Sequence, residues 1–301
     1  MDAGLAKPQP ASDGSVAVAT AVQAQPLPWP MMAWFLALLI VLFFPVLERM
    51  VTEWWVDSEQ MGHAFFVPLV AGYIVWQDRE RIMAAPVKTC WPAILLVAWG
   101  FCQMILGFLG ADYFLARTAF LFSLVGVIWT LAGTAVLRTI AFPLFLLLFM
   151  IRIPQFLFQQ LTFPLQNIAS SLATEALNLI GIPVSRTGNV LELPGRTLGV
   201  VEACSGIRSM LSLSFLSLAY AYFFDKRVWM RPVLFLTTIP IAIFTNGFRV
   251  TMTGIVGEYK KEWAEGIFHS MEGWVIFMLA LFCLMGVHKL ISRFTRSADA
   301  N

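Results

Sequence analysis

Cys204, Arg249 and His269, in the C-terminal third of the chain, are residue types that together perform acyl transfer. Cys204 lies in the stretch VVEACSGIRSML, one or two residues before a long apolar run. A helix N-terminus and a nearby cation favour the thiolate, which is the nucleophilic form of cysteine. An imidazole acts as general base and then as acid, and a guanidinium stabilises an oxyanion. We therefore expect Cys204 to be a nucleophile with His269 and Arg249 as its partners.

These three side chains are expected at one depth in a membrane. At 1.5 Å per helical residue, each lies about 27–33 Å from a basic residue at the inner end of its own apolar segment. The hydrocarbon core of a bilayer is about 30 Å thick, so all three reach its outer boundary. The basic residues from which these lengths are counted are Lys226, Arg231 and Lys289.

Both partners also have an interpretation without catalysis. Arg249 is compatible with a snorkelling arginine near a helix end, and His269 with a structural residue at the interface. The other cysteines favour a chemical role for Cys204, because they lie at the inner side or in the middle of their segments and are not expected to pair with it. An unpaired thiol facing an oxidising compartment is a liability unless it is used. These other cysteines are Cys90, Cys102 and Cys283.

Residues next to Cys204 are candidates for supporting roles. If this segment is extended, Glu202 points to the same side as Cys204 and would orient Arg249 or His269; otherwise it is a solvated loop residue. Backbone N–H groups near Ser205 and Gly206 would help to bind an oxyanion. Ser205 is also a rival nucleophile, although it lacks the G-x-S-x-G elbow of serine hydrolases.

The composition is that of a polytopic membrane protein. Of 301 residues, 59% are hydrophobic and only 13% are charged, whereas about 25% are charged in soluble proteins. The formal net charge of +2 gives no reason to expect a nucleic-acid partner. The predicted domains are a disordered tail at 1–30, a transmembrane domain at 31–292 and a short tail at 293–301.

Eight segments are apolar enough to be considered as membrane-spanning helices, which predicts an all-α fold. A section of about 50 residues between the fifth and the sixth does not have the pattern of a span. The eight predicted segments are 31–48, 61–77, 91–110, 113–135, 138–153, 206–224, 231–255 and 267–290.

The distribution of Lys and Arg predicts the orientation, because cytoplasmic segments are enriched in both. With both termini inside, eleven lie in internal segments and six in external ones. The predicted location is therefore a cytoplasmic membrane, with both termini cytoplasmic and Cys204, Arg249 and His269 at the outer face. The internal residues are Lys7, Arg79, Arg81, Lys88, Arg138, Lys226, Arg227, Arg231, Lys289, Arg293 and Arg296, and the external ones are Arg49, Arg152, Arg186, Arg196, Lys260 and Lys261.

The long section before Cys204 contains two further predicted elements. Residues 155–179 have apolar side chains at helical spacing with polar ones opposite, a pattern typical of an amphipathic interfacial helix or of a short buried bundle helix. Two short alternating runs around Pro194 and Gly195 predict a small β-hairpin that leads the chain to Cys204.

Several motifs resemble those of the exosortases, which are polytopic bacterial counterparts of sortases. The three motifs are ACSGIRS at 203–209, NGFRV at 246–250 and GIFHSMEGW at 266–274. HAFFVPLVAGYIVW at 63–76 and GNVLELPG at 188–195 are also similar, so the resemblance covers most of 45–290. These motifs add Asn246 and His63 to the supporting candidates. His63 is followed by Ala64, where the family pattern leads us to expect glycine.

The resemblance implies that Cys204, Arg249 and His269 form the catalytic set. It also implies substrates that are membrane-anchored proteins with a C-terminal PEP-CTERM-like sorting signal: a Pro-containing motif, a membrane helix and a basic cluster. The enzyme would cleave through a thioester and transfer the protein to an acceptor, a lipid or a polysaccharide, often alongside exopolysaccharide production. No cofactor and no metal are expected, since H-E-x-x-H is lacking.

The alternative hypothesis is a non-enzymatic transporter or scaffold in exopolysaccharide export, in which Arg249 and His269 line a polar path. The sequence has no evident paired repeats with broken helices, which many transporters contain. Labelling by an impermeant thiol reagent distinguishes the two hypotheses, because a scaffold gives no reason for an exposed, reactive Cys204.

Overall fold

The computed structural model describes residues 27–194, 196–200, 206–259 and 267–298. The predicted tail at 1–30 falls almost wholly outside them. The helices are α1 (Trp29–Leu42), α2 (Phe44–Val56), α3 (Ser58–Met61), α4 (Phe66–Gln77), α5 (Arg79–Ala84), α6 (Ile94–Leu109), α7 (Tyr113–Thr139), α8 (Ala141–Leu146), α9 (Gln155–Leu179), α11 (Gly206–Phe224), α12 (Met230–Tyr259) and α14 (Ile267–Ala298), and the strands are β1 (Ser185–Thr187), β2 (Val190–Leu193) and β3 (Arg196–Gly199).

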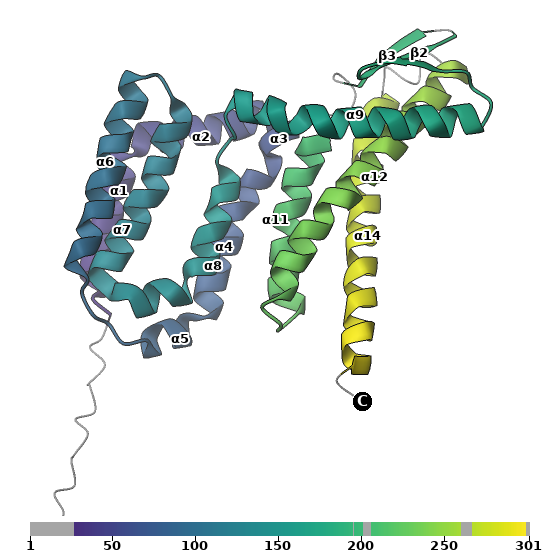
Figure 1. Ribbon diagram of the computed structural model, residues 1–301. Helices are drawn as coiled ribbons and strands as arrows, with labels where there is room; N and C mark the ends of the chain where they lie inside the picture. The colour runs from purple at the N-terminus through teal and green to yellow at the C-terminus, as the bar shows by residue number, and fades with distance from the viewer. Residues whose placement is uncertain (1–26, 195, 201–205, 260–266, 299–301) are drawn as a thin grey trace, which may run out of the picture.

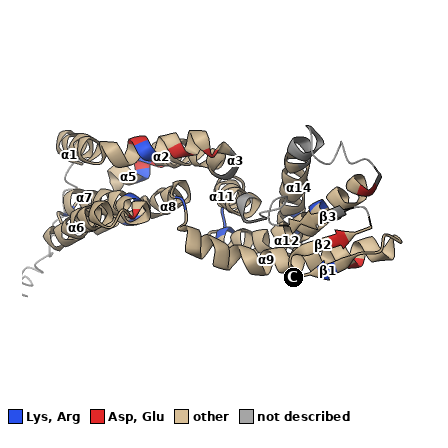
Figure 2. Cartoon of the chain, turned by 90° about the horizontal axis from the view of Figure 1, so that it is seen from above, with Lys and Arg blue, Asp and Glu red and all other residues tan. Residues whose placement is uncertain are grey.

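Most helices run side by side, and α9 lies across one end of them (Figure 1). The end at which α11 finishes and α12 begins is called the inner end below, and the end crossed by α9 is called the outer end. Seen from above, charged residues are concentrated on α2 and near β2 and β3, whereas α6, α9 and α14 are largely uncharged in this view (Figure 2). This distribution is expected if the uncharged helical surfaces contact lipid.

The prediction of eight membrane spans is not confirmed. Among the described residues, four helices are long and apolar enough to cross a membrane: Trp91–Leu109, Tyr113–Thr139, Met230–Glu258 and Gly273–Thr295. Two bent pairs raise the number to six: α1 with α2, at 69°, and Ala141–Met150 with α9, at 88°. Helix α4 has only 12 residues, and the stretch Ser209–Phe224 of α11 is a shorter apolar helix. The fold is nevertheless that of a multi-pass α-helical membrane protein.

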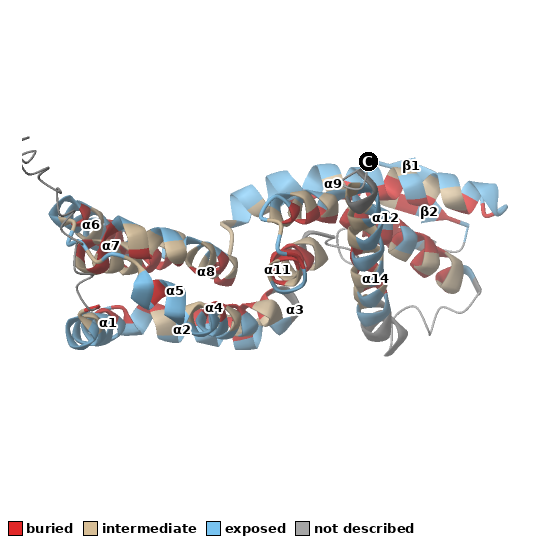
Figure 3. Cartoon of the chain, turned by 90° about the horizontal axis from the view of Figure 1, so that it is seen from below, coloured by how far each residue is buried: buried red, intermediate tan, exposed pale blue. Residues whose placement is uncertain are grey.

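Helix α9 has the predicted bounds and exposes its apolar face. Leu161, Ile168 and Leu172 on this face are exposed, whereas Gln166 and Ser170 on the polar face are buried against the rest of the protein. Figure 3 shows exposed residues along the outside of α9 and buried ones along its inner side. A buried bundle helix would show the reverse, and an apolar face open to lipid is what an interfacial helix requires.

The predicted two-stranded hairpin lies within a sheet of three strands. β2 pairs with β1 and with β3, both antiparallel, in the order β1-β2-β3. The additional strand arises because a turn at Gly188, whose φ is 65°, folds β1 back on β2. One face of the sheet packs on α9 and α12 through a buried cluster formed by Ala173, Leu177, Ile182, Leu191, Leu193, Leu198, Val200 and Val250.

At the inner end, α11 and α14 are joined by an extensive hydrogen-bond network. Asp225, directly after α11, accepts hydrogen bonds from the Arg227 guanidinium and contacts His288 Nε2 at 3.0 Å. The other ring nitrogen of His288 contacts the Tyr220 hydroxyl at 3.0 Å, and Arg227 also donates to Ser292 and Thr295. Arg227 is the main reason that the pKa of Asp225 lies well below its usual value. We call Tyr220, Asp225, Arg227, His288, Ser292 and Thr295 the inner network.

Candidate active site at the crossing of α9 and α12

Arg249 and Asn246 lie one turn apart on α12, on the same face of this helix. Asn246 is only 5% exposed, and its Nδ2 has no hydrogen-bond acceptor in the described part of the chain. The same holds for Nε of Arg249, which is half-buried. An unsatisfied buried donor costs about 1–3 kcal/mol, so such groups call for an explanation.

Helix α9 crosses α12 at the level of these two residues because α12 has glycines there. A Cβ added at Gly247 would lie 3.2 Å from Leu172 Cβ, and one added at Gly254 would lie 3.0 Å from Leu177 Cδ1. The two glycines are seven residues apart, which places both on the face of α12 that meets α9. This close contact brings the buried polar face of α9, with Gln166, to the turn that carries Asn246.

The sheet brings the chain that leads to Cys204 to the same place. Val200, four residues before Cys204, is fully buried in one cluster with Val250, the residue after Arg249. Its N–H donates to the Asn189 carbonyl at 3.0 Å, and the Asn189 carboxamide donates to Gln166 Oε1 at 3.5 Å. The chain therefore lies beside α12 at residue 200, and the next described element, α11, begins at Gly206.

The predicted nucleophile itself lies outside the described residues, as do Glu202 and Ser205. Gly206 is the first residue of α11 and His269 lies in the first turn of α14, and for these two only the backbone is described. The roles of Cys204 and His269 therefore stay predictions. In the sequence, Cys204 comes two residues before α11 and His269 is the third residue of α14, and both helices pack against α12.

His63 connects three parts of the fold. Its Nε2 lies 3.1 Å from the Phe149 carbonyl and its Nδ1 lies 3.1 Å from the Ser212 hydroxyl of α11. Ala64, found where the family pattern leads us to expect glycine, is completely buried. Ser212 is about 9 Å along α11 from Gly206, at 1.5 Å per residue. The contacts of His63 hold α11 against the segment before α9.

Three polar residues of this region were not singled out by sequence reasoning. Gln166 was recognised only as part of the polar face of α9, and neither Asn189 nor Ser212 was considered. Their significance depends on contacts between segments that are 149 and 23 residues apart in the sequence. No local spacing pattern carries that information.

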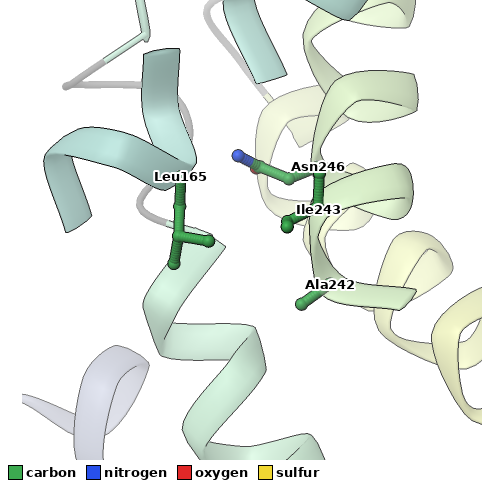
Figure 4. Close-up of a pocket in the computed structure, with 4 residues that line it drawn as sticks. All are labelled: Leu165, Ala242, Ile243 and Asn246. Atoms are coloured by element: carbon green, nitrogen blue, oxygen red, sulfur yellow. The ribbon is translucent and has the colours of Figure 1, made fainter. Parts of the chain in front are cut away.

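Two hollows lie along α9. The one at the crossing is lined by Leu165, Ala242, Ile243 and Asn246 and has no room for a water molecule (Figure 4). The other, of about 490 Å³, is mainly apolar and lies near the start of α9, lined by Phe114, Ile153, Pro154, Leu157, Gln160 and Leu161. Among the described residues, no three His, Cys, Asp or Glu side chains are grouped closely enough to hold a metal ion.

Comparison with known proteins gives one match. The family model of the transmembrane exosortases matches residues 54–286, which include α12, the sheet and the predicted positions of all three reactive residues. No curated protein and no solved structure matches the chain. Since the family model covers well over half of the sequence, the chain belongs to the transmembrane exosortases, a family of membrane-embedded peptidases and transpeptidases.

Proposed function

We propose that this exosortase is a cysteine transpeptidase that removes C-terminal sorting signals of the PEP-CTERM kind from membrane-anchored proteins. Cys204 forms a thioester with the substrate, and an acceptor, a lipid or a polysaccharide, then receives the protein. The reaction takes place at the outer face of the bacterial cytoplasmic membrane, with both termini in the cytoplasm. The proposal combines the family membership with the three reactive residue types.

The proposed mechanism has two steps, formation of a thioester on Cys204 and transfer of the protein to the acceptor. His269 takes the proton of the Cys204 thiol, and the thiolate attacks the carbonyl carbon of the scissile peptide bond. Arg249 stabilises the negative oxygen that results. The C–N bond then breaks, His269 gives its proton to the leaving amine, and the substrate remains as a thioester. A hydroxyl or amine of the acceptor, or water, then gives its proton to His269 and attacks the thioester carbon. The C–S bond breaks, and His269 returns the proton to the Cys204 thiolate.

The observation that carries the proposal is that Val200 and Val250 belong to one buried cluster. This cluster joins the chain just before Cys204 to the helical turn of Arg249, although the two residues are far apart in the sequence. The exposed apolar face of α9 supports a membrane-anchored substrate, because it sets the crossing at a lipid boundary in which such a substrate is held. The basic residues at the inner end support the orientation.

The test uses a reporter protein that ends in a Pro-containing motif, an apolar helix and an arginine cluster, expressed together with the enzyme. We expect Cys204→Ala and Cys204→Ser to accumulate in the membrane but to leave the reporter uncleaved. Cys283→Ala is the matched control and keeps activity, because Cys283 packs in the core between α12 and α14. Trapping the reporter on Cys204 and identifying the attached peptide by mass spectrometry gives the cleaved bond.

Normal cleavage by Cys204→Ala would show the proposal to be wrong. An inactive Ser205→Ala beside an active Cys204→Ala would instead indicate a serine nucleophile. Labelling of Cys204 by an impermeant maleimide added to intact cells tests the orientation, and protection of this thiol under conditions that label outer-loop control cysteines would contradict it.

A further inference from the structure

We propose that Asn246 is a further catalytic residue, whose side-chain N–H donates to the carbonyl oxygen of the scissile bond together with Arg249. This inference rests on the proposed function, since it concerns the oxyanion formed when Cys204 attacks. Neither the family match nor the pattern of reactive residue types assigns this role to Asn246.

The first argument is the pairing of two unsatisfied donors. Within the described residues, four buried side-chain atoms lack a hydrogen-bond partner, and two of them are Asn246 Nδ2 and Arg249 Nε. They lie on the same face of α12, one turn apart. The other two are Arg231 Nε, whose guanidinium lies over the rings of Phe142 and Tyr222, and Gln103 Oε1, whose carboxamide N–H donates to Thr118.

The second argument concerns solvent. Asn246 is 5% exposed, and the hollow on its inner side, toward Ala242 and Ile243, has no room for a water molecule. Figure 4 shows the carboxamide directed from α12 toward α9, across from Leu165. An acceptor must therefore approach from the outer side, which is the side of Arg249. A donor that is shielded from water and has no partner is already oriented, so neither it nor solvent has to reorient when charge develops beside it.

The third argument is that the neighbouring groups hold Asn246 in place without satisfying it. Gly247 brings α9 close to α12, so that Gln166, also 5% exposed, lies on the facing side of the crossing. The side-chain oxygen of Gln166 is already engaged by Asn189. Thr245 and Thr251, on either side of Asn246, bond to the backbone of α12 itself and offer Asn246 no alternative.

In the reaction, the two donors bind the oxygen that becomes negative when the Cys204 thiolate adds to the carbonyl carbon. The C–O double bond becomes a single bond in this step, and its electron pair rests on oxygen beside Asn246 and Arg249. When the C–N bond breaks, the double bond re-forms and the proton goes from His269 to the amine. A second donor of this kind typically accounts for a factor of about 100–1,000 in rate.

The test compares Asn246→Leu with Gln103→Leu, a matched replacement of a buried amide that lies in α6. We expect Asn246→Leu to slow thioester formation on Cys204 by about 100-fold or more. Substrate affinity, measured in the Cys204→Ala background, stays unchanged, because a donor used only in the transition state lowers kcat and not binding. The thermal midpoint stays equal or rises, since an unpaired donor has been removed. Gln103→Leu keeps the normal rate of thioester formation.

Asn246→Asp, which keeps the shape but replaces the donor by an acceptor, is expected to be equally slow and decides the matter if Asn246→Leu does not fold. Normal thioester formation in either variant overturns the inference, as does a loss of substrate affinity that accounts for the whole effect. If Cys204→Ala still processes the reporter, the proposed function itself is wrong. If Cys204→Ala is inactive and Asn246→Leu is fully active, only this inference is wrong.

Discussion

Polar side chains are buried at both ends of the molecule, but their hydrogen bonding differs. In the inner network, Asp225 is surrounded by Arg227 and His288, and His288 is bonded through both ring nitrogens. At the crossing of α9 and α12, Asn246 and Arg249 each keep a buried donor without an acceptor in the described residues. The same kinds of groups thus stabilise the fold at one end and remain available at the other.

The difference separates two uses of a buried polar group. A satisfied network rigidifies the helices that it joins, and its loss lowers stability. An unsatisfied donor lowers stability while the site is empty and gains a partner only when the oxyanion forms. Variants at the inner end should therefore change unfolding, and variants at the crossing should change turnover.

The largest effect is expected for Arg249→Gln. Loss of a charged donor beside the oxyanion should lower the cleavage rate by about 100-fold or more. The thermal midpoint in detergent should not fall, because Nε of Arg249 has no acceptor in the described structure. Reporter cleavage and thermal unfolding measured on one preparation check this. A variant that unfolds early while its folded fraction cleaves at the normal rate would place Arg249 with the inner network.

Asp225→Asn tests the opposite end. The free energy of unfolding should fall by about 2 kcal/mol, because Arg227 and His288 lose a charged acceptor. Cleavage per folded molecule should stay normal. Denaturant unfolding in detergent measures the change, and a specific loss of cleavage with full stability would contradict this prediction.

The pH dependence of stability sharpens the same prediction. Since Arg227 lowers the pKa of folded Asp225, the contribution of this carboxylate is complete above its unfolded pKa of about 4. It is lost as the pH falls below that value toward the folded pKa. The unfolding free energy of the unchanged protein should therefore decline in acid more steeply than that of Asp225→Asn, and parallel acid curves would show that Asp225 is not responsible.

Gly247→Val should affect both properties, because it separates the two helices of the crossing. Contact with Leu172 is already tight for a single added carbon, so we expect a loss of about 1–2 kcal/mol in stability together with slower cleavage. Gly286→Val in α14 is the control, since no atom lies within 4 Å of its added Cβ. Equal unfolding of the two variants would show that the close approach of α9 is not required.

The smallest effect is expected for Tyr222→Phe. The Tyr222 hydroxyl donates to Asp78 between α11 and the end of α4, and its ring stacks on Phe142. Only the hydrogen bond is lost, so stability should fall by about 1 kcal/mol without a change in cleavage. A clear loss of cleavage in this variant would show that the inner end also controls the site.

The sequence alone predicts the class of the protein, its family and the bounds of α9. Hydrophobic composition and periodicity are sufficient for the class and for α9, because they report helix length and the presence of two faces, whereas the family follows from the resemblance of the motifs. Periodicity does not report which face the protein covers, so the burial of Gln166 and Ser170 emerged only from the fold. Eight spans were not confirmed among the described residues, because apolar segments such as 61–77 and 138–153 are divided into short helices by a 3-10 turn or a bend.

The candidate site divides in the same way. Residue types and helical rise predicted that Cys204, Arg249 and His269 lie in one layer, which needs no knowledge of lateral contacts. The burial of Val200 and Val250 in one cluster, and the lack of a partner for Asn246 Nδ2 among the described residues, depend on how α9, the sheet and α12 meet. Whether a buried side chain finds a hydrogen-bond partner in the folded protein cannot be read from the spacing of residues in the sequence.

Helix α9 exposes its apolar face and buries its polar face, and this has a consequence for membranes of different thickness. A helix whose apolar face lies in one leaflet holds the crossing at a constant distance from the surface of that leaflet, whatever the thickness of the bilayer. Stretching or thinning of the bilayer is then taken up at the inner ends of α12 and α14. Cleavage in vesicles should therefore depend little on acyl-chain length, and a protein anchored by a longer or shorter helix would still present its signal at the same height.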